Sequence, residues 1–470
     1  MTTWKRIALA GALSAATAAC SHQQRMKPIV NAYATGNYTA AANALAPLLK
    51  DRRDSEKDRT IYELEAGSVY AAAGDIKRSM QAFATADERM WEYLDDSPEI
   101  RISEQAAAIF TNQTIINYYG RPHDRIMCTT YEGLTHLLQG DVSGAAVSMR
   151  RALEWQLDAV AKNQEEIDHL EKKAQEASEK KGYDSAKAQE DPRTKASFDS
   201  AYGPIREMKG YGEFEIPYAT MLRALQLQLT GRASEMEQAT VAFRRVAGML
   251  PEADRAFVLE DARTCEEASR GSAAMPPMVY IFCEAGMAPW LHELRIDIPL
   301  FMQEVPYVGA AFPVIKFHED SPGPFTATCA GSAVQAMLMT DMDRVIADDF
   351  KQRLPAIITM TLVSSATKAI ATYAAQKAAG DNGGWVALAG AIFQVATNSA
   401  DLRTWLTLPK RVYYARCPAP ADGVLTIQLG NGYILAPISV ESTGATLVHV
   451  RLPSTGAQPV VRTMRFATAG

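Results

Sequence analysis

The hydrophobic pattern of this chain changes at Met278, and that change constrains the fold more than any other feature. Before it, apolar residues recur at the three- to four-residue spacing of amphipathic helices. After it, short β-branched and aromatic stretches are separated by Pro and Gly, which is typical of strands. Helices and strands that are segregated along the chain predict an α+β fold.

Four segments before Met278 share one pattern, in which a helical run ends at a glycine and a second helix follows. They are AYATGNYTAAANAL, VYAAAGDIKRSMQAFATA, HLLQGDVSGAAVSMRRAL and LQLTGRASEMEQATVAFRRV. In the second segment Ser79, Phe83 and Ala86 follow Gly74, an offset pattern that puts a small, a large and a small side chain on one helix face. The matching residues of the later segments are Ala145, Met149 and Ala152 after Gly140, and then Ala239, Phe243, Val246 and Pro251.

This pattern resembles the tetratricopeptide repeat (TPR), in which small residues let two antiparallel helices approach and a large residue fills the gap between neighbouring pairs. The glycine turns are unequally spaced along the chain. We therefore expect a degenerate TPR-like helical domain, a solenoid, over residues 28–260. A helical bundle without repeats is the alternative.

Within that region, residues 162–200 are rich in Glu, Lys, Ala and Gln. Opposite charges four residues apart, such as Asp168 and Lys172, favour an exposed helix, which Gly182 and the pair Asp191-Pro192 should interrupt. We expect a solvated helical protrusion or mobile loop, and a partner-binding arm is the alternative.

Strand-like stretches form two blocks, residues 275–340 and 406–470. Asx-Gly and Thr-Gly pairs divide the second block, and such pairs supply the positive φ angles of tight hairpins. They are Asp422-Gly423, Asn431-Gly432, Thr443-Gly444 and Thr455-Gly456. We expect the two blocks to pair into one mixed sheet or a sandwich.

Residues 341–405, between the blocks, predict an inserted helical hairpin with a glycine-rich connection at residues 380–384. Lys368 and Lys377 interrupt its first helix, and the clean apolar part of the second is too short to cross a bilayer. Core helices that cover a sheet are therefore favoured over a membrane hairpin.

The first nineteen residues have the organisation of a secretory signal peptide: a positive start with Lys5 and Arg6, an apolar run, and the small residues Thr17-Ala18-Ala19. Cys20 follows directly, which resembles the lipobox of bacterial lipoproteins, although Thr17 stands where that motif has leucine. By this resemblance Cys20 carries acyl chains such as palmitate, residues 20–27 form a lipidated linker, and Ser21 favours the outer membrane. An ordinary signal peptide, which leaves a soluble periplasmic protein, is the alternative.

Composition excludes some functions. The net charge is −6, so nothing favours binding to a nucleic-acid backbone. Apart from Cys20, the cysteines are widely spaced and form no metal-binding pair. One or two disulfides are compatible with a periplasmic location, while Cys283, in an apolar stretch, is expected to be a buried hydrophobic residue. The remaining cysteines are Cys128, Cys265, Cys283, Cys329 and Cys417.

Four stretches together resemble an uncharacterised family of bacterial TPR-containing lipoproteins. They are NYYG followed by CTTYEGLTHLLQGDVSGAAVSMRRA, YIFCEAGMAPWLHELRIDIPL, RLPAIITMTLVSSATKAIATYAAQK and ATNSADLRTWLTLP. The resemblance implies helical repeats followed by a mixed α/β region. It also implies a role at the cell envelope, because members look to be encoded beside lipoproteins related to activators of penicillin-binding proteins.

No catalytic or cofactor-binding motif is convincing, and no cofactor is expected. His292-Glu293 lacks the second histidine of a zinc-protease helix. Ser365 and Lys368 have the spacing of penicillin-recognising serine enzymes without the accompanying elements, so helix packing by Ser365 is favoured. The acidic residues near 341–349 lack calcium-loop spacing and indicate a helix start.

Asp401, Arg403 and Trp405 are the candidate binding residues. Arg and Trp are enriched at binding hot spots, whereas an ion pair between Asp401 and Arg403 with a packed Trp405 is the structural alternative.

Two functions follow from the sequence. The first is a periplasmic, membrane-anchored adaptor whose concave repeat surface binds a protein or peptide of the cell envelope, in its narrower form within peptidoglycan-synthesis control. The second is an envelope enzyme or glycan- or peptide-binding module in the strand-rich region.

Overall fold

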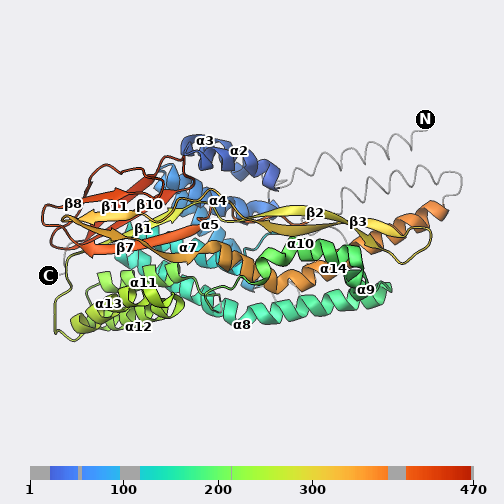
Figure 1. The fold of residues 1–470 in the computed structure, drawn as a ribbon, viewed down its shortest axis with the longest axis horizontal. Helices are drawn as coiled ribbons and strands as arrows, with labels where there is room; N and C mark the ends of the chain where they lie inside the picture. Colours follow the sequence, from blue (N-terminus) through green and yellow to red (C-terminus); the bar gives the residue numbers. More distant parts are fainter. Residues whose placement is uncertain (1–21, 51–55, 96–116, 213, 379–398, 467–470) are drawn as a thin grey trace.

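The computed structural model describes residues 22–50, 56–95, 117–212, 214–378 and 399–466, and it is an α+β fold (Figure 1). The helices are α2 (His22–Ala34), α3 (Tyr38–Lys50), the short η1 (Glu56–Asp58), α4 (Arg59–Ala72), α5 (Ile76–Asp95), α7 (Pro122–Leu137), α8 (Val142–Lys181), α9 (Ser185–Glu190), α10 (Pro192–Arg206), α11 (Pro217–Leu229), α12 (Ala233–Met249), α13 (Glu252–Ser269) and α14 (Met342–Ala378). The strands are β1 (Met278–Ala285), β2 (Trp290–Pro299), β3 (Tyr307–Lys316), β4 (Thr326–Cys329), β5 (Ser332–Gln335), β6 (Met337–Asp341), β7 (Arg411–Pro418), β8 (Val424–Gln428), β9 (Ile438–Ser439), β10 (Ala445–Leu452) and β11 (Val460–Phe466).

The four predicted helix–glycine–helix segments are confirmed as the pairs α2–α3, α4–α5, α7–α8 and α11–α12. Gly36, Gly74, Gly140 and Gly231 have φ angles of 80°, 83°, 78° and 71°. This left-handed conformation is open to glycine and strained for residues with a Cβ, so a glycine ends the first helix of each pair.

Small residues let the helices of a pair approach closely, and the large residues of the pattern pack against them within the pair. A Cβ on Gly67 of α4 would overlap the ring of Phe83 of α5, and the Ser79 hydroxyl donates a 2.7 Å hydrogen bond to the Gly67 carbonyl. Gly133 of α7 makes room for Met149 of α8 in the same way. The small and large positions therefore face each other within a pair.

The two strand blocks pair into one mixed sheet with β1 at its centre. The strand order is β11-β10-β1-β7-β6, with β1 parallel to β10 and antiparallel to β7. A second sheet, of order β5-β4-β8-β9, also joins strands of both blocks. The two sheets share a core that includes Ile281, Ala327 and Ile427, so the expected sandwich is present.

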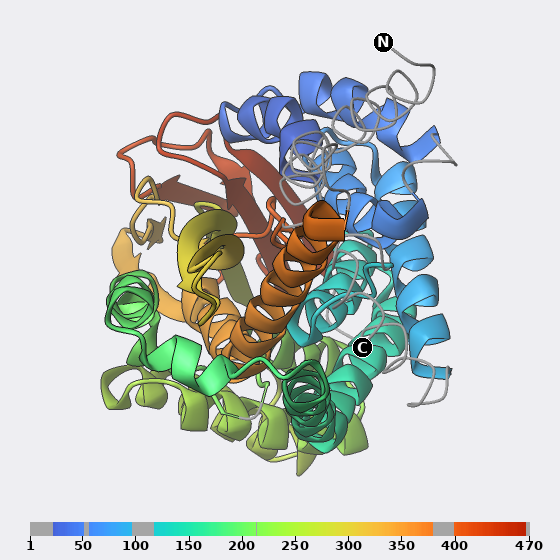
Figure 2. The same cartoon turned by 90° about the vertical axis from the view of Figure 1, so that its right-hand side faces the viewer.

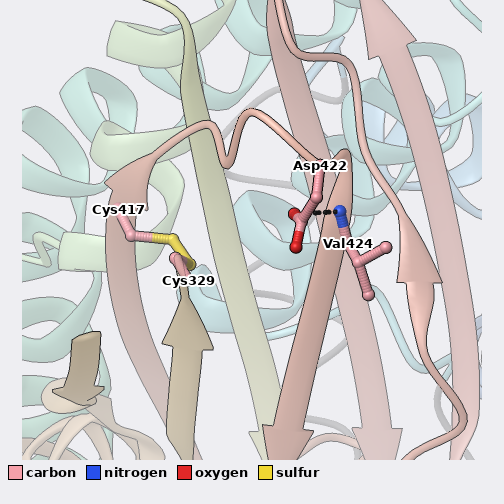
Figure 3. Close-up of a disulfide and its surroundings, with 4 residues drawn as sticks. All are labelled: Cys329, Cys417, Asp422 and Val424. Atoms are coloured by element: carbon pink, nitrogen blue, oxygen red, sulfur yellow. Dashed lines mark hydrogen bonds between the residues drawn. A yellow bond between two sulfur atoms is a disulfide. The ribbon is translucent and has the colours of Figure 1, made fainter. Parts of the chain in front are cut away.

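A disulfide between Cys329 of β4 and Cys417 of β7 links the two sheets (Figure 3). Cys128, Cys265 and Cys283 are buried and reduced, which confirms the prediction for Cys283. The two bonded positions are 88 residues apart in the sequence, and the stacking of the two sheets brings them together.

The turn predictions hold in part. Gly423 and Gly432 have positive φ angles, and the Asp422 carboxylate accepts a 3.0 Å hydrogen bond from the Val424 amide (Figure 3). Gly444 does not adopt a positive φ, and its lack of a Cβ instead makes room for the Phe466 carbonyl of the adjacent strand β11. The stretch FTATCAGSAV, residues 325–334, contains nearly all of the β4–β5 hairpin.

Seen end-on, the helices of the N-terminal two-thirds form an arc around the sheets and α14 (Figure 2). Tyr280 and Phe282 of β1 pack into the same core as Phe83 of α5 and Trp155 of α8. The side of the arc that faces the sheet is thus filled by the chain itself. A partner would therefore have to bind elsewhere on the helix pairs.

The charged segment 162–200 is not a solvated protrusion. It forms the end of α8, α9 and most of α10, which pack with α14 and the β2–β3 hairpin around a core of their own. Tyr183 donates a hydrogen bond to the Pro299 carbonyl (2.8 Å) and Tyr202 to that of Pro313 (3.1 Å). One stripe of apolar residues at helical spacing is enough to bury one face of this segment, although many of its other residues are charged.

The predicted hairpin at 341–405 is confirmed for its first helix, α14. Most of its second helix lies outside the described residues, and residues 399–405, expected to end that helix, are irregular instead. Among the described helices, α14 is the one that is long and apolar enough to cross a membrane, and half of its most apolar stretch is buried in the protein. It packs on β3 and α8, as expected for a core helix.

The linker expected at residues 20–27 is also largely absent, because α2 begins at His22 and Met26 is fully buried. Cys20 and the signal segment 1–19 lie outside the described residues.

We predict that Gly67→Ala lowers the free energy of unfolding by about 1–3 kcal/mol, because the new methyl group overlaps the buried Phe83 ring. Gly248→Ala is the matched control: this α12 position is exposed with open space around it, so its stability should be unchanged or higher by up to about 1 kcal/mol. Chemical denaturation of both variants gives the comparison. Equal stability of the two variants would contradict the close α4–α5 contact.

Candidate functional site

Arg403 is the centre of a buried ion-pair group that joins distant parts of the chain. Its guanidinium lies 2.8 Å from an Asp401 carboxylate oxygen and 3.2 Å from an Asp58 carboxylate oxygen. Asp58 is the last residue of η1 and directly precedes α4. Burial alone would lower the pKa of Arg403, but the charges of Asp401 and Asp58 outweigh it and raise that pKa. The predicted Asp401–Arg403 pair is therefore present, with Asp58 as a third member that the sequence did not reveal.

Trp405 lies apart from this group. It is fully buried, its ring contacts those of Phe83 and Tyr131, and its indole N–H donates to Ser68 and Thr407. A partner in solution has no access to it. Trp405 is therefore packed in the core, as in the structural alternative, and is not part of a binding hot spot.

A pocket opens beside Asp401 and Arg403, with about 610 Å³ of space that atoms do not fill, part of it open to solvent. One wall is apolar and comes from β2, β3 and α14, with Trp290, Ile315 and Phe350 among its residues. The other wall is polar and combines α7, α14 and the segment before β7. Its members are Arg121, His123, Asp349, Arg353, Asp401, Arg403 and Thr404.

The carboxylates of the polar wall are already engaged. Both oxygens of Asp401 accept from Arg403, and one oxygen of Asp349 accepts a 2.9 Å hydrogen bond from Arg353. Burial would raise the pKa of both carboxyls, yet nearby cations, Arg121 among them, hold each pKa below its ordinary value. Both aspartates are thus ionised, and the pocket combines an apolar side with a charged side, the usual make-up of a ligand site.

Sequence reasoning missed four of these polar residues. The sequence patterns did not identify Arg121, His123 or Arg353 as site residues. Asp349 was assigned to an acidic helix start, whereas it lies two turns into α14 and faces His123 at 3.7 Å. The available signal was the i, i+4 spacing of Asp349 and Arg353 on one helix.

A separate groove of about 470 Å³ lies between α8, α11 and α12, on the helices of the third and fourth pairs. Leu153, Ala219 and Val241 line it together with Arg223 and Arg245. Burial and the like charges of Arg245 and Arg150 lower the pKa of Arg223. Arg245 is paired with Glu215, so among the described residues the unpaired positive charge of this cationic groove comes from Arg223.

The remaining sequence candidates are not parts of one site. Ser365 is buried in α14, and burial lowers the pKa of Lys368, one turn later, to about 8. His292 and Glu293 lie on β2, where the Glu293 carboxylate accepts from Arg295 and the Ala400 amide. In the part of the chain that the structure describes, no cluster of three or more His, Cys, Asp or Glu is arranged to hold a metal ion.

Comparisons with protein-family models, with curated proteins and with solved structures find no match for this chain. The family resemblance seen in the sequence therefore stays a prediction. Function has to be inferred from the pocket and the groove themselves.

We predict that Arg403→Met lowers the free energy of unfolding by about 3–5 kcal/mol, because it leaves Asp58 and Asp401 buried without their cation. Arg206→Met is the control, since the ion pair of Arg206 with Asp199 is exposed and should contribute at most about 1 kcal/mol. Urea denaturation at neutral pH measures both. A loss at Arg403 no larger than that at Arg206 would show that the buried group is not needed for stability.

Proposed function

We propose that this protein is a lipid-anchored adaptor of the bacterial cell envelope, on the periplasmic face of the outer membrane, which binds a partner protein through TPR-like helix pairs. The observation that carries the proposal is the cationic groove between α8, α11 and α12. Control of peptidoglycan synthesis is the narrower role that the sequence resemblance implies.

The helix pairs support the repeat part of this proposal. Each pair turns at a glycine, and small residues face large ones within the α4–α5 and α7–α8 pairs. Successive pairs also contact one another, α3 with α4, α5 with α7, and α8 with α11. A degenerate array of stacked repeats has these contacts.

The groove has unused donors that suit an acidic partner. In the described part of the chain, the Arg223 guanidinium makes no hydrogen bond or ion pair, and the buried Gln156 amide nitrogen has no hydrogen-bond partner. A buried donor without an acceptor costs about 1–3 kcal/mol, which a bound carboxylate would recover. We infer that the groove takes an acidic segment of the partner.

Apolar side chains extend the groove along α8. Leu157 and Val160 are 55% and 39% exposed and follow Leu153 at helical spacing, and Val241 of α12 is 65% exposed on the opposite side. Exposed apolar side chains next to cations favour a segment that carries both acidic and apolar residues. The partner segment is therefore expected to be amphipathic.

The disulfide supports the compartment. A Cys329–Cys417 bond persists in oxidising environments such as the bacterial periplasm and is rare in reducing ones. His22 is buried against Tyr62 two positions after Cys20, so acyl chains on Cys20 would hold the folded body close to the membrane. A soluble periplasmic form remains the alternative.

A second candidate function, a ligand-binding module in the strand-rich C-terminal part, is favoured by the pocket beside Arg403, whose walls come from β2, β3 and α14. An envelope enzyme has weaker support, because the one nucleophile candidate, Ser365, is buried.

We predict that the mature protein begins at Cys20 with acyl chains attached, and that Cys20→Ser moves it from the membrane fraction to the soluble periplasmic fraction. Mass spectrometry of the mature N-terminus and cell fractionation measure the two effects. Fractionation with Cys128→Ser, a buried thiol, is the control. Cleavage elsewhere or an unmodified Cys20 would contradict the anchor and leave the soluble alternative.

The groove is tested by a photo-crosslinking residue at position 241, in living cells, with identification of the crosslinked peptide by mass spectrometry. We expect one main partner whose crosslinked peptide contains Asp or Glu, and a loss of about ten-fold or more in yield with Arg223→Glu, because the charge at the groove is reversed. Arg263→Glu, an exposed α13 position outside the groove, is the matched control. Equal yields for both variants would refute the groove as the partner site.

A further inference from the structure

In the pocket beside Arg403, one wall has donors without a partner in the described part of the chain, and arginines bind its two carboxylates. Asp401 and Asp349 are bound by Arg403 and Arg353. In contrast, the guanidinium of Arg121, on the same wall, has no carboxylate within 4 Å among the described residues. The pocket therefore carries one cation that the chain itself does not neutralise by contact.

His123 adds a second unused group. The side chain is only 4% exposed, and its Nδ1 has no hydrogen-bond partner. The nearest carboxylate oxygen, Asp349 Oδ2, lies 3.7 Å from this nitrogen, which is too long for a hydrogen bond. A buried ring nitrogen left unpaired on a pocket wall is costly unless a ligand or water completes it.

The opposite wall accepts an apolar group. It contains Ile346, Phe350 and Ile357 of α14, Ile315 of β3 and Trp290 of β2. About 610 Å³ between the lining side chains is not filled by atoms, and part of this space is open to solvent. A ligand that satisfies both walls needs acceptor oxygens with negative charge at one end and an apolar chain or ring at the other.

We propose that this pocket binds a small carboxylic acid, with its carboxylate at Arg121 and His123 and its apolar part against α14 and β3. The guanidinium of Arg121 offers charge-assisted hydrogen bonds to the carboxylate, which are stronger than those between neutral groups. This ligand site is separate from the groove between α8, α11 and α12 and does not depend on the proposed adaptor function. The carboxylate can belong to a free aliphatic acid or to the end of a peptide.

Calorimetric titration of the full chain tests the proposal with two pairs of probes. Decanoate and decanol represent the free acid and its uncharged analogue; N-acetylphenylalanine and its amide represent a peptide end. We expect at least one acid to bind about ten-fold or more tightly than its uncharged partner, because hydrogen bonds to a charged group are stronger than those between neutral groups. Which acid binds more tightly identifies the source of the carboxylate.

Two variants locate the site. Arg121→Gln should remove the preference for the acid over its uncharged analogue, whereas Arg232→Gln, an exposed arginine of another region, should keep it. Ile357→Trp fills the apolar side and should weaken the binding of both members of a pair. Thermal unfolding of each variant without ligand checks that it folds.

The proposal is overturned if neither acid binds at millimolar concentration. It is also overturned if acid and uncharged analogue bind equally, or if Arg121→Gln retains the wild-type preference while folded.

Discussion

The structure depends on one strand that is buried on both faces. All eight residues of β1 are buried, with Tyr280 and Phe282 toward the helices and Val279 and Ile281 toward the second sheet. A strand of this kind needs an apolar layer on each side, because an uncovered face costs about 25 cal/mol for each Å² of apolar surface left in water. Helices, central sheet and small sheet are therefore stacked as three layers, and β1 lies in the middle one.

Buried polar contacts connect the first helices to the last strands. The Glu65 carboxylate of α4 accepts from the Leu406 and Thr407 amides, and burial raises its pKa to about 7. Arg451 of β10 donates to the Tyr33 hydroxyl and to the carbonyls of Glu284, Gly286 and Thr407. Such groups are stable only when every donor and acceptor is paired, so they fix one register between the helical arc and the sheets.

This architecture places the two candidate binding sites on different surfaces. The sheet occupies the inner side of the helical arc, which leaves the groove with Arg223 as the place where helix pairs can meet a partner. The pocket with Arg121 lies where α7, α14 and the β2–β3 hairpin meet, beside the start of α2. The proposed adaptor would thus carry its partner groove and its proposed ligand pocket on separate surfaces.

Local patterns in the sequence determined the helix pairs, their glycine turns, nearly all strand positions and the Asp401–Arg403 pair, because neighbours in sequence set hydrophobic period, φ angle and short-range charge contacts. They did not determine the Cys329–Cys417 bond, the burial of segment 162–200, or the meeting of Arg121 and His123 with Asp349. Those features join residues tens to hundreds of positions apart. Only tertiary packing decides them, since distance in space between such residues follows from how the layers stack.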